Sequence, residues 1–220
     1  MKKAASFALG CKVNQYESEA IAELFAEKGY EIVGIDEEAD VYVINTCTVT
    51  NFGDKKSRQL IRKVKRQNEN AIVAVVGCYA QTAPKELMEI AGVNLVIGTK
   101  DRAQIVEMVE QYDRANGVEN HVSDIMKERV FEPLSIQKLA NRTRAYLKIQ
   151  DGCSQYCSYC IIPYARGPIR SREPQEVVAE VKRLAENGFK EVVLTGIHVA
   201  SYGKDRRDTS LLDILKQVHE

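Results

Sequence analysis

Short apolar runs alternate with amphipathic segments along the first half of the chain. The runs at 4–9, 41–45 and 71–76 are rich in Ala, Val and Ile, and their length and composition favour buried strands. The other elements predicted in this region are strands at 31–34 and 94–98 and helices at 17–28, 54–68, 84–91 and 101–114. Because alternating strands and helices build parallel sheets that helices cover, the pattern predicts a doubly wound α/β amino-terminal domain at 1–115.

The periodicity fades after this region and then returns. Residues 116–143 are polar and charged, which predicts a linker with little regular structure. A second pattern follows, with strands at 144–150 and 191–196, helices at 174–187 and from about 210, and a cysteine-rich loop. A barrel of six or eight βα units needs on the order of 180 to 250 residues. Residues 144–220 therefore predict the first units of an incomplete barrel, and we expect the chain to be a fragment of a longer polypeptide.

Composition and charge narrow the class of protein. The chain has 45% hydrophobic residues and 31 basic against 31 acidic side chains, as in a globular protein rather than a disordered one. No apolar run approaches the roughly 20 residues of a membrane helix, so we expect no membrane span. Lys2 and Lys3 before a short apolar run ending at Cys11 resemble a lipoprotein signal, but the run is too short to favour one. Without a secretory signal, the six cysteines predict reduced thiols in the cytoplasm rather than disulfides.

Three of the cysteines form a compact motif. Cys153, Cys157 and Cys160 are spaced C-x3-C-x2-C in a loop directly after the strand at 144–150. Three thiolates on one short loop can bind three corners of a four-iron cluster and leave the fourth iron open to a ligand. A zinc site is the alternative, but it needs a fourth ligand, and the next candidate is the distant His198. A disulfide would leave an odd thiol and is less favoured.

The other three cysteines are far apart in the sequence but occupy equivalent places. Cys11, Cys47 and Cys78 each follow the end of a predicted strand. Since the carboxyl ends of parallel strands lie along one edge of a sheet, three separate loops can bring these thiols together. The alternative is that they are small buried residues, as free cysteines often are.

The motifs resemble a known family. C-x3-C-x2-C with Tyr159 before the last cysteine resembles the signature of the radical S-adenosylmethionine (SAM) superfamily. The segments LGCKVNQYESE (9–19), NTCTVT (45–50) and VVGCYAQ (75–81) resemble the amino-terminal domain of methylthiotransferases. Within that family, GCKVNQYESE is similar to the branch that acts on threonylcarbamoyladenosine in tRNA, next to the anticodon on its 3′ side.

The resemblance implies two 4Fe–4S clusters, one on Cys153, Cys157 and Cys160 and an auxiliary one on Cys11, Cys47 and Cys78. One SAM molecule would supply the methyl group to sulfur held at the auxiliary cluster, and a second the radical that removes hydrogen from carbon 2 of the adenine. Such an enzyme needs tRNA and an electron donor, whose identity the sequence does not give. No protein partner is predicted, and the fragment alone is expected to be inactive. The alternatives are the same chemistry on isopentenyladenosine tRNA or a ribosomal protein, or a nonenzymatic metal protein that binds RNA.

Other candidate residues lie outside the cysteine motifs. The helix at 54–68 carries basic residues that could bind phosphate or simply form a solvated face, namely Lys55, Lys56, Arg58, Arg62, Lys63, Lys65 and Arg66. Arg166, Arg170 and Arg172 are candidates for substrate phosphate or cofactor carboxylate, with a surface role equally favoured.

Residues near the strand ends complete the prediction. The resemblance places Thr195 and Gly196 near SAM, whereas His198 is left without a role, and no catalytic residue is assigned beyond the cluster ligands. Lys12, Asn14 and Gln15 beside Cys11 are suitable in kind to recognise the group on the adenine, although Asn14 and Gln15 are at least as well suited to a structural turn.

Overall fold

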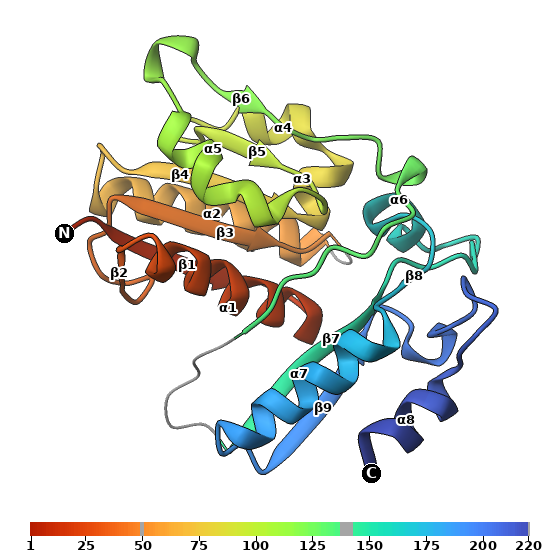
Figure 1. The fold of residues 1–220 in the computed structure, drawn as a ribbon. Helices are drawn as coiled ribbons and strands as arrows, with labels where there is room; N and C mark the ends of the chain where they lie inside the picture. The colour runs from red at the N-terminus through yellow and green to blue at the C-terminus, as the bar shows by residue number, and fades with distance from the viewer. Residues whose placement is uncertain (49–50, 137–142, 220) are drawn as a thin grey trace.

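A six-stranded parallel sheet forms the larger part of the molecule (Figure 1). The computed structural model describes residues 1–48, 51–136 and 143–219, the side chains of 51–54 excepted. The strand order is β2-β1-β3-β4-β5-β6, and every neighbouring pair is parallel. The strands are β1 Lys3–Ala8, β2 Glu31–Ile32, β3 Val41–Thr46, β4 Ile72–Gly77, β5 Leu95–Ile97 and β6 Glu119–Asn120. The α/β parallel-sheet prediction is confirmed.

Helices cover both faces of this sheet. Helices α1 (Lys12–Glu27) and α5 (Ile105–Gln111) cover one face, where Phe25 packs in the same core as Val43. Helices α2 (Asn51–Gln67), α3 (Cys78–Thr82) and α4 (Pro84–Met88) cover the other, where Val64 packs with Ile44. Val43 and Ile44 enter different cores because successive side chains of a strand point to opposite faces. The buried central strands therefore read as continuous apolar runs.

Three helical segments differ from the sequence prediction. Helix α1 begins at Lys12 rather than at residue 17, because Val13 and Asn14 are buried and Cys11 caps the helix. The prediction missed α3, a single turn that starts at Cys78. The helix expected at 101–114 begins as a 3₁₀ turn at Arg102–Gln104 before α5.

The segment predicted as a linker contributes to the first sheet. Strand β6 pairs with β5, and 3₁₀ turns lie on either side of it at Arg114–Asn116 and Ile125–Lys127. Leu134 and Ile136 are buried in a cluster with Tyr16 and Ala20 of α1. Residues 137–142 of the predicted linker lie outside the described residues, and the division at 1–115, 116–143 and 144–220 stays a prediction.

The second part is a three-stranded sheet in the order β8-β7-β9. Its elements are β7 Arg144–Asp151, α6 Ile162–Arg166, β8 Arg170–Ser171, α7 Pro174–Glu186, β9 Glu191–Gly196, the 3₁₀ turn Val199–Ser201 and α8 Leu211–His219. Strand β9 runs parallel to β7 with α7 between them in the chain, as expected of the first βα units of a barrel. The sequence predicts that the last helix continues at residue 220, which lies outside the described residues.

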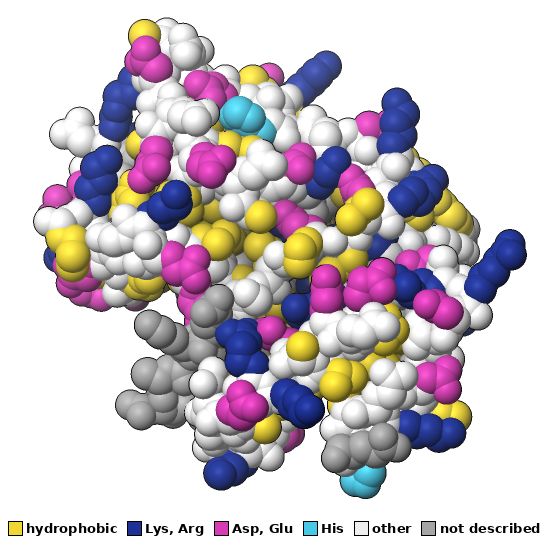
Figure 2. All heavy atoms as spheres, in the orientation of Figure 1, with side chains coloured by type: hydrophobic (Ala, Val, Ile, Leu, Met, Phe, Trp, Pro, Cys, Tyr) yellow, Lys and Arg dark blue, Asp and Glu magenta, His cyan; other side chains and the backbone are white. Residues whose placement is uncertain are grey.

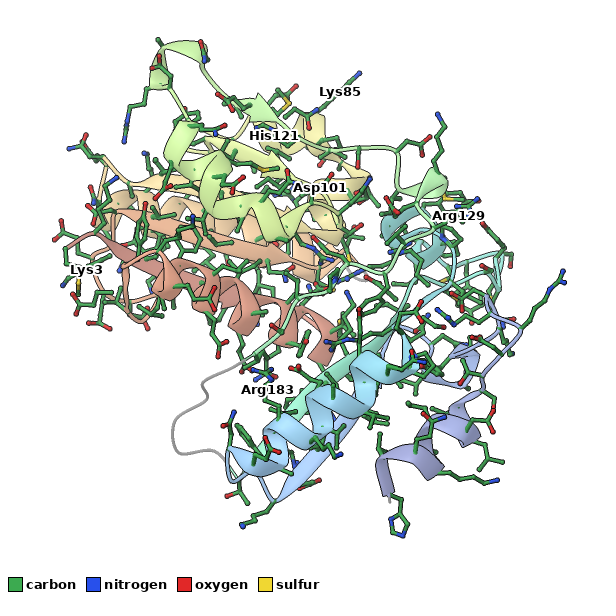
Figure 3. The ribbon with its side chains drawn as sticks, in the orientation of Figure 1. Lys3, Lys85, Asp101, His121, Arg129 and Arg183 are labelled. Carbon is green, nitrogen blue, oxygen red and sulfur yellow. The ribbon has the colours of Figure 1, made fainter. Side chains whose placement is uncertain are left out.

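The two parts contact each other directly. Figure 3 shows Arg183 of α7 beside the segment that leaves the first sheet, and its guanidinium Nη2 donates to the carbonyl of Ile136 at 2.8 Å. Helix α1 lies between the large sheet and β7 (Figure 1). On the face seen in Figure 2, basic and acidic side chains are interspersed. None of the described helices is both long enough and apolar enough to cross a membrane.

Candidate metal centre

Three adjacent strands carry the first set of cysteines to one edge of the sheet. Strands β1, β3 and β4 are neighbours, and all three run in the same direction. Cys47 and Cys78 directly follow β3 and β4, and Cys11 follows β1 after Leu9 and Gly10. Parallel strands end at the same edge, so the three loops lie next to one another. Cys11 also occupies the N-cap position of the 16-residue helix α1, without a capping hydrogen bond from its side chain, and the N-terminus of a helix favours negative charge.

Close packing fixes the Cys11 and Cys47 loops against each other. Gly10 has a φ of 98°, and a Cβ there would lie 2.7 Å from both Cβ and Sγ of Cys47. Only glycine fits this position, because any side chain would meet the cysteine and strain the backbone. Asn14 is wholly buried and donates from Nδ2 to the carbonyls of Leu9 (2.8 Å) and Thr46 (2.9 Å). Asn14 thus ties the ends of β1 and β3 together, which gives it a structural role.

The second set lies in the loop after β7. The amide of Cys153 donates to the carbonyl of Gly167 (2.9 Å), and the amide of Cys160 donates to that of Cys157 (2.9 Å). These bonds close the loop into a compact turn. Within it Tyr156 takes a left-handed φ of 48°, and Tyr159 is 91% exposed.

One cavity brings the two sets together. It has a volume of about 430 Å³, and five of the six cysteines line it, namely Cys11, Cys47, Cys78, Cys153 and Cys160. Thr195, Gly196 and His198, at the end of β9, line it as well, as does Lys12. Cys157 is exposed and is not part of the lining. The loops of Cys11 and Cys153, which are 142 positions apart in the sequence, therefore open into the same space.

The cavity fits an iron–sulfur group in its chemistry and its size. All six cysteines are free thiols, the ligand type that iron–sulfur clusters use. The space of about 430 Å³ has room for groups larger than one ion. In the described part of the chain, no three His, Cys, Asp or Glu side chains are close enough to bind a single metal ion.

A buried ionic network lies behind the cavity, and sequence reasoning missed most of it. Glu17 of α1 contacts Arg102 (2.6 Å), Lys148 of β7 (2.7 Å) and Arg166 of α6 (2.6 Å). Asp151 contacts Lys148 at 2.6 Å. All five side chains are at most 2% exposed. The network thus joins the first helix of the large sheet to the loop that follows the second cysteine set.

The network keeps its carboxylates charged. Burial alone would raise the pKa of Glu17, but Arg102, Arg166 and Lys148 outweigh it and hold that pKa well below its usual value. Burial would also raise the pKa of Asp151, but the positive charges of Lys148, Arg166 and Arg170 outweigh this effect and lower the pKa below its usual value. The ion pairs are therefore formed at neutral pH.

The three arginines after the cysteine loop are buried, so the surface role considered for them is wrong. Arg166, Arg170 and Arg172 are at most 5% exposed. Arg170 lies 3.6 Å from Asp151, and Arg172 lies 3.5 Å from Glu176 of α7. Carboxylates of the chain itself thus lie beside these guanidinium groups, although Nε and Nη1 of Arg172 have no hydrogen-bond partner among the described residues. Burial of three arginines was not visible in the sequence, since arginine is mostly exposed in proteins.

Arg166 also contacts a cysteine of the first set. Its Nε donates to Sγ of Cys78 at 3.1 Å, while its Nη2 donates to Oδ1 of Asn14 at 2.5 Å. Burial raises the pKa of the Cys78 thiol, and Arg166 acts against this shift. Cys11 donates from Sγ to the same Oδ1 of Asn14 at 3.4 Å.

The basic residues of α2 lie away from the cavity. Arg62, Lys63, Lys65 and Arg66 line an open groove of about 1030 Å³ together with Gln59, Glu69, Ala91 and Gly92. Lys63 pairs with Asp36, and Lys65 donates from Nζ to the carbonyl of Ala71 (3.0 Å). Arg58 donates to the hydroxyl of Tyr79 (2.8 Å). The exposed Arg62 and Arg66 make no ion pair within the described residues.

Comparison with known proteins identifies both parts. Residues 3–98 match the model of uncharacterized protein family UPF0004, and residues 147–218 match that of the Radical SAM superfamily. The chain is 52% identical to threonylcarbamoyladenosine tRNA methylthiotransferase MtaB of Bacillus subtilis, over 99% of this chain and 48% of the relative. Residues 3–98 thus belong to the UPF0004 family and residues 147–218 to the Radical SAM superfamily. The resemblance stated from the cysteine motifs is confirmed.

The other relatives that the chain matches carry two kinds of name. MtaB of Aquifex aeolicus is 43% identical over 93% of this chain and 50% of the relative. A tRNA-2-methylthio-N(6)-dimethylallyladenosine synthase of Dictyoglomus thermophilum is 34% identical over 96% of this chain and 48% of the relative. The chain spans about half the length of the curated relatives that it matches.

Proposed function

We propose that the full-length protein is a radical SAM methylthiotransferase that converts threonylcarbamoyladenosine in tRNA into its 2-methylthio derivative. The observation that carries the proposal is the single cavity onto which both cysteine sets open. A methylthiotransferase must bring a sulfur-bearing group and a radical source to the same substrate atom, and a shared cavity meets that need. The names of the relatives from Bacillus subtilis and Aquifex aeolicus support the threonylcarbamoyl branch.

Each cysteine set has its own role in this proposal. Cys153, Cys157 and Cys160 would hold the radical-generating cluster, and Cys11, Cys47 and Cys78 the auxiliary cluster. When bound, the first cluster supplies the electron that starts the radical reaction on an unactivated C–H bond, which no side-chain base can open. The chain's own residues hold the thiols in place through the backbone hydrogen bonds of the Cys153 loop and through the hydrogen bonds of Asn14.

Thr195 and Gly196 are proposed to contact SAM. Both lie at the end of β9 and line the cavity beside Cys153 and Cys160. A Cβ at Gly196 would lie 2.9 Å from the backbone oxygen and the Cβ of Gln150, so the backbone there packs closely against β7. The amide of His198 donates to Oε1 of Gln150 (2.7 Å), which fixes the same turn.

The groove along α2 is proposed to bind the phosphate backbone of the tRNA. Helix α2 follows the Cys47 loop and extends over 17 residues, or about 25 Å at 1.5 Å per residue. Four basic side chains and one acidic side chain, Glu69, line the groove. Lys63 is paired with Asp36, but Arg62 and Arg66 are exposed and make no ion pair among the described residues, and such cations attract RNA phosphates. A tRNA whose modified base enters the cavity could therefore place its stem along this helix.

The free thiols suit a reducing compartment, and we place the protein in the cytoplasm.

The proposed activity is tested by mass spectrometry of tRNA nucleosides from cells that lack the full-length gene. The 2-methylthio derivative of threonylcarbamoyladenosine should disappear and should return when the gene is restored. Loss of the isopentenyladenosine derivative instead would move the protein to the branch named for the Dictyoglomus thermophilum relative.

A further inference from the structure

Arg166 links the two cysteine sets through a fixed set of hydrogen bonds. It ends α6, six residues after Cys160, and its side chain is wholly buried. Its Nε points at Sγ of Cys78 (3.1 Å), Nη1 at Glu17 (2.6 Å) and Nη2 at Asn14 (2.5 Å). All three nitrogen atoms of the guanidinium are thus bonded to residues of the first part of the chain.

The charges around Arg166 leave a positive excess beside the sulfur. The connected ion pairs of the described residues join four buried cations, namely Arg102, Lys148, Arg166 and Arg170, to three carboxylates, namely Glu17, Glu132 and Asp151. A buried charge is costly unless it is paired. Arg166 bonds Sγ of Cys78 in addition to a carboxylate. A negatively charged sulfur at Cys78 would therefore balance the fourth cation of the network.

We infer that Arg166 is a positioning residue that holds Cys78 in place for the auxiliary cluster and raises the reduction potential of that cluster. The inference rests on the proposed function, because it requires a cluster on Cys11, Cys47 and Cys78. Hydrogen bonds to cluster sulfurs and nearby positive charge stabilise the reduced, more negative form of a cluster. Glu17 and Asn14 hold the guanidinium so that its Nε–H faces the sulfur.

The arrangement also explains why the donor is an arginine. A lysine at this position could not bond sulfur, carboxylate and amide at once from a rigid plane. Because Arg166 follows the Cys153–Cys160 loop, it also ties the position of that loop to Cys78. Separation of the two parts would break the sulfur contact and the buried ion pairs at the same time.

The test uses full-length protein in which Cys153, Cys157 and Cys160 are replaced by Ala, so that only the auxiliary cluster remains. Arg166→Gln and Arg166→Lys are compared with Arg102→Gln. The Arg102→Gln variant is a matched control, because Arg102 also contacts Glu17 at 2.6 Å and is wholly buried, but within the described part of the chain it donates no hydrogen bond to a cysteine. Iron content, the circular dichroism spectrum and the midpoint potential from an EPR-monitored titration are measured.

We expect both Arg166 variants to show a more negative midpoint potential than the parent, with an altered EPR spectrum. The Arg102 variant should shift the potential less, because it removes a buried charge but no hydrogen bond to Cys78, and it should keep the parent's EPR spectrum. Selective loss of iron from the Arg166 variants alone would also support the inference. An unchanged potential in an iron-loaded Arg166→Gln protein would overturn it, as would equal losses of iron and secondary structure in the Arg166 and Arg102 variants. If the parent itself binds no iron, the auxiliary cluster of the proposed function fails instead.

Discussion

Glu17 and Arg166 lie 149 positions apart in the sequence, yet their side chains meet at 2.6 Å and both are wholly buried. Glu17 belongs to the helix that Cys11 caps, and Arg166 follows the loop of Cys153, Cys157 and Cys160. The pair therefore fixes the two cysteine sets relative to each other. It also makes the interface between the two parts depend on buried charge rather than on apolar packing alone.

Replacement of Glu17 by Gln is expected to destabilise the protein strongly. The change leaves Arg102, Lys148 and Arg166 buried without their shared carboxylate, and breaking a buried pair in this way costs about 3–5 kcal/mol. Denaturant unfolding of the two variants Glu17→Gln and Glu191→Gln measures the effect. Glu191 contacts Arg144 at 2.7 Å but is about half exposed, so its replacement should change the unfolding free energy little. Equal effects of both changes would contradict the prediction.

Acid should weaken the same interface. The folded-state pKa of Glu17 is lowered below its ordinary value of 4.5, so its stabilising contribution is present above that pH and is lost as the pH falls through the folded pKa. The unfolding free energy of the wild type should therefore fall below about pH 4.5, and that of Glu17→Gln should fall less steeply. Unfolding curves from pH 7 to pH 3 check this, and parallel pH profiles would count against it.

Gly10→Ala is expected to disturb the auxiliary cysteines specifically. Gly10 has a φ of 98°, and a Cβ there meets Cys47 at 2.7 Å, whereas Gly29 has a φ of 85° with nothing within 4 Å of its Cβ. Both Ala variants should lose about 1–2 kcal/mol from the left-handed backbone. Only Gly10→Ala should also lower the iron bound after anaerobic reconstitution. Equal iron content in Gly10→Ala and Gly29→Ala would show that Cys47 tolerates the displacement.

The groove along α2 gives a prediction about salt. Arg62→Glu with Arg66→Glu should weaken tRNA binding by the full-length protein and reduce the slope of log K against log salt concentration by about 0.7 to 0.9 for each phosphate that the protein no longer neutralises. The control is Lys182→Glu with Lys190→Glu, which makes the same change in charge at exposed positions of the second part. Filter binding at several salt concentrations measures both. If the two double variants behave alike, α2 is an ordinary solvated helix face.

The sequence predicted which cysteines meet in space better than it predicted the residues that surround them. Strand ends can be located from apolar runs, and parallel strands must end at one edge, so the meeting of Cys11, Cys47 and Cys78 follows from local signals. The burial of Arg166 does not follow from local signals. Its partners Glu17 and Asn14 belong to a helix whose pattern of polar and apolar residues gives no sign that two of its polar side chains bind a buried arginine. Long-range pairs of charged residues carry no local signature.

Strand β6 was missed for a similar reason. Glu119 and Asn120 are polar residues that look like loop sequence, and they pair with β5 through backbone hydrogen bonds that require no particular side chain. Strand β8 is likewise two residues long, Arg170–Ser171. Elements this short are defined by the neighbouring strand rather than by their own periodicity.

The last prediction concerns the number of clusters. Anaerobically reconstituted full-length protein should bind about eight iron atoms, as expected of two four-iron clusters ligated by cysteine. The triple variant of Cys153, Cys157 and Cys160 should bind about four, and so should that of Cys11, Cys47 and Cys78. Five of the six cysteines line one cavity, but different elements hold the two sets. The ends of β1, β3 and β4 hold Cys11, Cys47 and Cys78, and the turn after β7 holds Cys153, Cys157 and Cys160, so each set should assemble its cluster without the other. Iron analysis with Mössbauer spectroscopy of each triple variant measures this directly. If the variant without Cys11, Cys47 and Cys78 keeps all of its iron, those three thiols bind no iron and the auxiliary cluster does not exist.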